Sequence, residues 1–128
     1  MKFRNKKHKE IFTEAIGRVS YKNFALLATL YLLTADCFLW KRAQPYICRN
    51  RIDFERFQPI KSTENSYTLF CAAKDLYTST KYLSIADLAD SRLVPPKLFE
   101  VICSAMEIRR AGVSSVYSEQ IDQPKGVM

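Results

Sequence analysis

Few residues of this chain have the type and spacing that catalysis requires. A cysteine or serine nucleophile needs a nearby base, most often histidine, and His8 is the single histidine among 128 residues. It stands among lysines with no nucleophile motif beside it, so we expect an exposed residue on a helix surface. Asp87 and Asp90 would share one helix face, but helix capping and hydration account for such a pair. We therefore expect no enzyme active site.

The cysteines and glycines indicate neither a metal site nor a nucleotide-binding loop. Cys37, Cys48, Cys71 and Cys103 form no CxxC pair of the kind that structural zinc sites use. Three glycines are too few for a loop that wraps a phosphate with backbone amides. Because most of the cysteines fall in apolar helical stretches, we expect buried, reduced thiols. The sequence thus predicts no cofactor.

The strongest functional signal is the uneven distribution of charge. The chain has a formal net charge of +7. Residues 1–61 contain thirteen Lys or Arg and five Asp or Glu, whereas residues 62–128 contain seven and eight. Lys and Arg concentrated in this way release counterions from phosphates when they bind a nucleic acid. A solvated basic face that only keeps the protein soluble is the alternative.

Two basic clusters supply the candidate residues for binding a polyanion. Aromatic residues are interleaved with the second cluster, at Tyr46, Phe54 and Phe57. Exposed rings at these positions would stack on bases, and burial of the rings in the core is the alternative. We expect nucleic acid or a nucleoprotein complex as the partner. The candidate cations are Lys6, Lys7, Lys9, Lys41, Arg42, Arg49, Arg51 and Arg56.

The hydrophobic pattern predicts an all-α fold, a small bundle of four to five helices around a central apolar helix. The central helix is expected over 24–43, because this segment is apolar on nearly every side. Asp36 interrupts it and needs a partner if it is buried. The segment 44–61 is either a short helix over 51–57 or an extended segment with a short strand. Further helices are expected over about 5–19, 63–77, 84–90 and 95–111.

The same pattern predicts the domain organisation. We expect one helical domain over 1–116 and a flexible polar tail over 117–128. The uncharged run 24–35 is shorter than the roughly twenty residues of a membrane span. No apolar signal core follows the basic start of the chain. We therefore expect a cytoplasmic protein that does not engage a membrane.

The helices expected over 84–90 and 95–111 follow one another as in a helix–turn–helix DNA-binding motif. The second helix of such a motif projects hydrogen-bond donors from its start into the major groove. Here that start consists of Pro95, Pro96 and Lys97, which read bases poorly. Ordinary helix packing is favoured, and a DNA-binding regulator is the alternative function.

Three longer segments carry a resemblance. They read LLATLYLLTAD (26–36), STENSYTLFCAAKDLY (62–77) and SIADLADSRLVPPKLFEVICSAMEIRRAG (84–112), after the opening MKFRNKKHKEIF. In these segments, which span most of the chain, the protein resembles an uncharacterised family of short proteins from mobile elements of gut Firmicutes. The resemblance implies an accessory protein of phage or plasmid type, such as an anti-CRISPR inhibitor of an effector nuclease. None of the motifs has an assigned chemical role, so no site residue is carried over.

Overall fold

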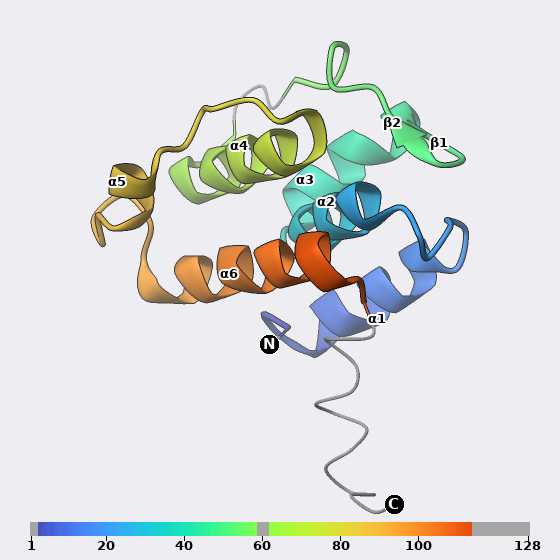
Figure 1. Ribbon diagram of the computed structural model, residues 1–128, viewed down its shortest axis with the longest axis horizontal. Helices are drawn as coiled ribbons and strands as arrows, with labels where there is room; N and C mark the ends of the chain where they lie inside the picture. Colours follow the sequence, from blue (N-terminus) through green and yellow to red (C-terminus); the bar gives the residue numbers. More distant parts are fainter. Residues whose placement is uncertain (1–2, 59–61, 114–128) are drawn as a thin grey trace, which may run out of the picture.

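The apolar helix α2 (Phe24–Thr34) lies at the centre of the structure (Figure 1). Every residue from Leu26 to Thr34 is buried. The helix packs against α4 (Glu64–Thr78), α6 (Pro96–Ala111) and α1 (Lys6–Ile16). A helix that is apolar all round needs neighbours on several sides. The expected helical bundle around a central apolar helix is confirmed.

The structure is a computed structural model, and it describes residues 3–58 and 62–113. The tail expected over 117–128, and the end of the domain expected at residue 116, lie outside the described residues. No helix of the described ranges combines the length and the apolar character needed to cross a membrane.

The apolar segment 24–43 forms two helices instead of the single helix that we expected. The second, α3 (Cys37–Ala43), begins at Asp36, whose Oδ1 accepts a hydrogen bond from the amide of Leu39 at 3.1 Å. The other oxygen of Asp36 accepts one from the hydroxyl of Ser66, in α4, at 2.6 Å. Aspartate is a favoured N-cap because its carboxylate satisfies an amide that lacks a helical partner. The polar interruption is therefore the start of a new helix.

The segment after α3 forms a small hairpin, so the helix expected as one alternative over 51–57 is wrong. A 3₁₀ turn, η1 (Gln44–Tyr46), leads into β1 (Ile47–Cys48), which pairs antiparallel with β2 (Arg51–Ile52). Ile47 lies opposite Ile52 in this pairing. The amide of the buried Ile52 donates to the hydroxyl of Tyr77 at 3.1 Å, which fastens the hairpin to α4.

The capping signals at the end of the chain operate as the sequence predicts. In α5 (Ile85–Leu88), the hydroxyl of Ser84 accepts from the amide of Asp87, and the carboxylate of Asp87 accepts from the amide of Ser84, both at 3.0 Å. Helix α6 ends at Gly112, whose φ of 87° is left-handed. Glycine fits this position because a Cβ would lie only 2.7 Å from Cε1 of Phe24.

Helix α5 and the hairpin lie toward opposite ends of the longest axis of the molecule (Figure 1). Helices α1 and α3 lie in the half of the molecule that holds the hairpin. We call α1, α3 and residues 44–58 the basic half, since they carry the eight candidate cations. Residues 79–95, around α5, form the opposite end and are called the α5 end.

Candidate functional site

His8 is buried, so the expectation that it lies on the helix surface is wrong. Its side chain is 2% exposed and packs against the ring of Tyr31, with centroids 4.7 Å apart. Nδ1 accepts a hydrogen bond from the amide of Arg4 at 2.9 Å, so Nε2 carries the proton and donates it to the carbonyl of Tyr31 at 2.8 Å. Burial lowers the pKa of His8 to about 4. A neutral imidazole with both nitrogens bonded fastens α1 to α2 and offers no base to a nucleophile.

The cysteines are free, but only part of the expectation for them is confirmed. Cys71 is buried and Cys103 is half-buried, whereas Cys37 and Cys48 are exposed. Burial raises the pKa of the Cys71 and Cys103 thiols, which disfavours their reactive thiolate forms. Within the described ranges, no group of three His, Cys, Asp or Glu residues is placed to hold a metal ion.

The region expected to resemble a helix–turn–helix has a short first helix. Helix α5 contains four residues, which is about one turn. Helix α6 buries its apolar face in the core. The exposed start of α6 carries Lys97 and Glu100, whose carboxylate would repel phosphates, and its other exposed cations, Arg109 and Arg110, lie in the last turn, far from the start that reads bases. These features do not favour α6 as a helix that reads DNA.

All eight candidate cations are exposed, and none of them forms an ion pair with a described residue. The salt bridge within residues 3–58 and 62–113 joins Nε of Arg92 to Oδ1 of Asp90 at 3.4 Å. The eight exposed side chains are those of Lys6, Lys7, Lys9, Lys41, Arg42, Arg49, Arg51 and Arg56.

Two carboxylates in or beside the basic half bind uncharged groups. Asp36 caps α3 and binds Ser66, as described above. Oδ1 of Asp53 accepts from the amides of Glu55 and Arg56, at 3.1 and 3.2 Å. Asp36 and Asp53 therefore stabilise a helix start and a turn, while Glu10, Glu14 and Glu55 of the same region are exposed and form no ion pair with a described cation.

The cations of the helices point in several directions. In α1, Lys7 precedes Glu14 by seven residues and shares its flank, whereas Lys6 and Lys9 lie on other sides of the helix. In α3, Arg42 lies over the ring of Phe38, 4.7 Å from its centroid. The basic half therefore carries cations over several faces and has no single basic stripe.

The aromatic residues interleaved with the second basic cluster are mostly core residues, as the burial interpretation predicts. Phe54 and Phe57 are 4% and 0% exposed, and both pack against Phe70 of α4. Tyr46 is half-buried and stacks on Phe57, with centroids 5.8 Å apart. These rings anchor residues 44–58 to α4 and are not available as a stacking surface.

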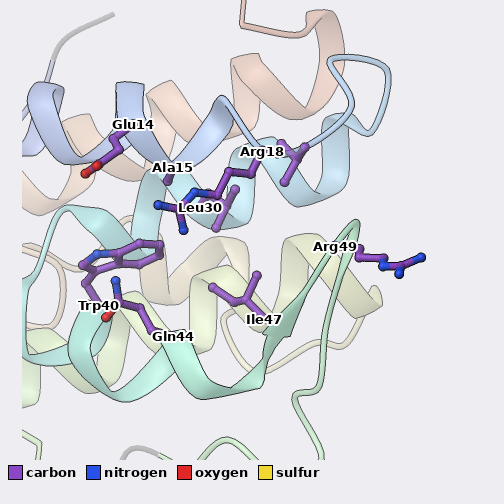
Figure 2. Close-up of a pocket in the computed structure, with 9 residues that line it drawn as sticks. Glu14, Ala15, Arg18, Leu30, Trp40, Gln44, Ile47 and Arg49 are labelled. Atoms are coloured by element: carbon purple, nitrogen blue, oxygen red, sulfur yellow. The ribbon is translucent and has the colours of Figure 1, made fainter.

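A different aromatic residue, Trp40, lies beside cations. It lines a pocket of about 390 Å³ between α1, α3 and the hairpin (Figure 2). Figure 2 shows the side chain of Arg18 reaching across the pocket in the direction of Trp40, and Arg49 pointing outward from the hairpin. The lining residues are Glu14, Ala15, Arg18, Val19, Leu30, Trp40, Gln44, Ile47 and Arg49.

The hairpin end of this pocket is fixed by Asn50. Its side-chain oxygen accepts from the amide of Ser20 at 2.8 Å, and its carbonyl accepts from the side chain of Asn23 at 3.0 Å. These bonds hold the hairpin tip against the connection between α1 and α2. They also hold Arg49, whose φ of 55° is left-handed. A residue other than glycine in this left-handed conformation destabilises the fold by about 1 kcal/mol.

The sequence predicted one cation of this pocket and missed its other polar and aromatic residues. Arg49 was a candidate, whereas Arg18, Trp40 and Gln44 were not. Trp40 and Gln44 are four residues apart, a spacing that places them on one flank of α3. This spacing is visible in the sequence. It does not show that the flank of α1 that carries Glu14 lies across the pocket from Trp40 and Gln44.

The chain matches no family model, no curated protein and no solved structure.

Proposed function

We propose that this protein is a non-enzymatic binding protein that engages nucleic acid, free or within a nucleoprotein, through the exposed cations of the basic half. One observation carries the proposal: eight exposed Lys and Arg side chains lie in one half of the molecule, and none forms an ion pair with a described residue. Unpaired cations of this kind gain free energy by releasing the counterions of phosphates.

The shape of the basic half favours contacts with a phosphate backbone over the reading of base edges in a groove. Its cations come from α1, α3 and residues 44–58 and face several directions. Contacts to phosphates position a protein on a nucleic acid and carry no sequence information. A flexible strand follows such a surface more easily than a rigid duplex does, so single strands are the favoured ligand class.

The resemblance described above suggests one specific form of the proposal. In it, the nucleic acid is the guide RNA of an effector nuclease, and the protein is an anti-CRISPR inhibitor. Addition of the purified protein should then block target cleavage by the loaded effector. Cleavage at an unchanged rate, with nucleic-acid binding intact, would remove this form and leave the general proposal.

The general proposal is tested by titrating the protein into labelled single-stranded RNA, single-stranded DNA and duplex DNA at low salt. The variant with Arg49, Arg51 and Arg56 changed to Ala should bind single strands at least about tenfold more weakly, since it loses three phosphate contacts. Its thermal stability should stay close to that of the wild type, because all three side chains are exposed. Absence of binding to every nucleic acid at low salt would overturn the proposal.

A further inference from the structure

We infer that the pocket between α1 and α3 holds one unpaired nucleobase, stacked on Trp40, while Arg18 and Arg49 bind the adjoining phosphates. This inference rests on the proposed function and assigns it a specific subsite. It gives Trp40 the stacking role that was one of two interpretations of Tyr46, Phe54 and Phe57.

The position of Trp40 in α3 leaves part of its ring open to a ligand. Leu39 and Ala43 are buried and form the core face of the helix. Trp40 and Gln44 follow them by one residue each, so they lie on the flank beside that face. Trp40 is accordingly half-buried, and its ring forms a wall of the pocket. A partly exposed indole is a good stacking surface, because every base has a π-face.

The volume of the pocket suits one base. About 390 Å³ lies near the lower end of the range for small-molecule pockets. Ala15, Leu30 and Ile47 supply apolar walls. A base in a duplex is paired and stacked, and it would first have to be flipped out of the helix to enter. The pocket therefore discriminates in favour of single strands.

The charged groups around the pocket give the ligand an orientation. Arg18 and Arg49 supply two guanidinium groups, which are suited to phosphate. Glu14 precedes Arg18 by one helical turn, and Figure 2 shows it on the opposite side of the pocket from Arg49. Its carboxylate repels phosphate and accepts hydrogen bonds, so the edge of the base, and not the backbone, faces it.

A carboxylate at the base edge selects among the bases. Guanine presents two adjacent N–H donors on its Watson–Crick edge, and an ionised Glu14 can accept both. The same edge of uracil or thymine presents one donor between two carbonyl oxygens, which Glu14 would repel. The pocket should therefore prefer guanine.

The conformation of Arg49 supports a role at the pocket mouth. A glycine in its place would avoid the strain of a left-handed backbone. The hydrogen bonds of Asn50 hold the tip of the hairpin in place despite this strain. Strain maintained by surrounding contacts is common at binding sites.

The single tryptophan of the chain makes the test direct. Short single strands with one guanine in an otherwise abasic backbone should quench the fluorescence of Trp40, and a fully abasic strand should not. Duplexes should bind without quenching. The Trp40→Leu variant should bind the guanine strand about 5- to 100-fold more weakly than the wild type. Trp40→Phe should recover most of this loss, and Tyr21→Leu, at an exposed ring outside the pocket, should bind as the wild type does.

The outcomes separate this inference from the proposed function. If single strands bind without quenching and Trp40→Leu binds them as tightly as the wild type, the pocket is not a base subsite, although the proposed function stands. If no strand binds, the proposed function itself is wrong. Quenching by guanosine monophosphate alone, at the affinity of the strand, would show a nucleotide site and overturn the inference. Should Trp40→Leu fail to fold, the variant with Arg18 and Arg49 changed to Ala must lose the quenching.

Discussion

The α5 end of the molecule uses its charged side chains differently from the basic half. Asp75, near the end of α4, accepts hydrogen bonds from three groups of the α5 end, the hydroxyl of Thr80 at 2.6 Å and the amides of Tyr82 and Leu83 at 2.9 and 2.8 Å. Asp90 pairs with Arg92. In the basic half, eight exposed cations have no such role. Carboxylates shape turns in both regions, but only the basic half carries the eight exposed candidate cations, which remain available to a partner.

The two regions also differ in where their aromatic and large apolar side chains lie. The basic half turns Phe54 and Phe57 into the core. The surface near α5 exposes several large apolar side chains, and Ile85 is 86% exposed. Since aromatic burial anchors residues 44–58 while their cations stay exposed, stability and binding depend on different residues of the same segment. Variants should therefore change one property without the other.

The largest expected effect concerns the attachment of the basic half to the core through His8. An unfolded histidine titrates near pH 6.5, and the pKa in the folded protein is about 4. Between these values the unfolded chain binds a proton that the folded chain does not, so stability falls as the pH drops. The loss should reach roughly 3 kcal/mol at pH 4. Urea denaturation at several pH values measures it, and His8→Gln should flatten this part of the profile.

The next largest effect is expected at the α5 end. Asp75→Ala removes the acceptor of three hydrogen bonds and should destabilise the fold by roughly 2 kcal/mol. Nucleic-acid affinity should not weaken, because the lost group is negatively charged, lies outside the basic half and binds residues of the α5 end. Thermal melting and a binding titration of the same sample check both statements. A large loss of affinity in a folded Asp75→Ala sample would break the comparison between the two regions.

A smaller loss of stability is expected from the capping box of α5. Ser84→Ala removes the hydroxyl that accepts from the amide of Asp87 and should cost about 1 kcal/mol. Hydrogen exchange should show the loss locally, in the amides of residues 85–89. Ser84→Asp keeps an acceptor at the N-cap and serves as the matched control. Equal stability of Ser84→Ala and the wild type would contradict the assigned role of the cap.

The smallest change in stability, of opposite sign, is expected from Arg49→Gly. Glycine relieves the left-handed backbone and should stabilise the fold by roughly 0.5 kcal/mol, partly offset by the greater freedom of the unfolded chain. The same change removes a cation from the pocket mouth, so nucleic-acid binding should weaken. A melting temperature that rises while affinity falls would separate the two properties at one residue. Unchanged affinity would show that Arg49 has no part in binding.

The elements of the fold were predictable where the signals are local. The caps at Ser84 and Gly112 appear where the sequence places them, and the hydrogen bonds of the Ser84 cap involve only neighbouring residues. The close approach of Gly112 to Phe24, in contrast, is not visible in the local sequence. The break at Asp36 was visible as a polar interruption, but its partner Ser66 comes from another helix. The spacing of apolar residues alone therefore could not distinguish a buried polar residue in one long helix from a cap between two.

The candidate site was predictable in its charge and not in its architecture. Long cationic side chains on a small domain remain exposed almost by default. The pocket, in contrast, depends on how α1 and α3 meet, since Arg18 and Trp40 are 22 residues apart in the chain. Burial of Phe57 likewise depends on Phe70 of α4, which no local pattern indicates.

The salt dependence of binding tests the central claim most directly, when two matched triple variants are compared. One variant replaces Arg49, Arg51 and Arg56 with Ala. The other replaces three exposed cations outside the basic half with Ala, namely Lys81, Lys97 and Arg110. For a single strand, the slope of log K against log salt concentration should become shallower by about 2 in the first variant, since each phosphate contact contributes about 0.7. The slope of the second should match that of the wild type. Equal changes in both variants would show that binding follows net charge alone and would contradict a binding surface in the basic half.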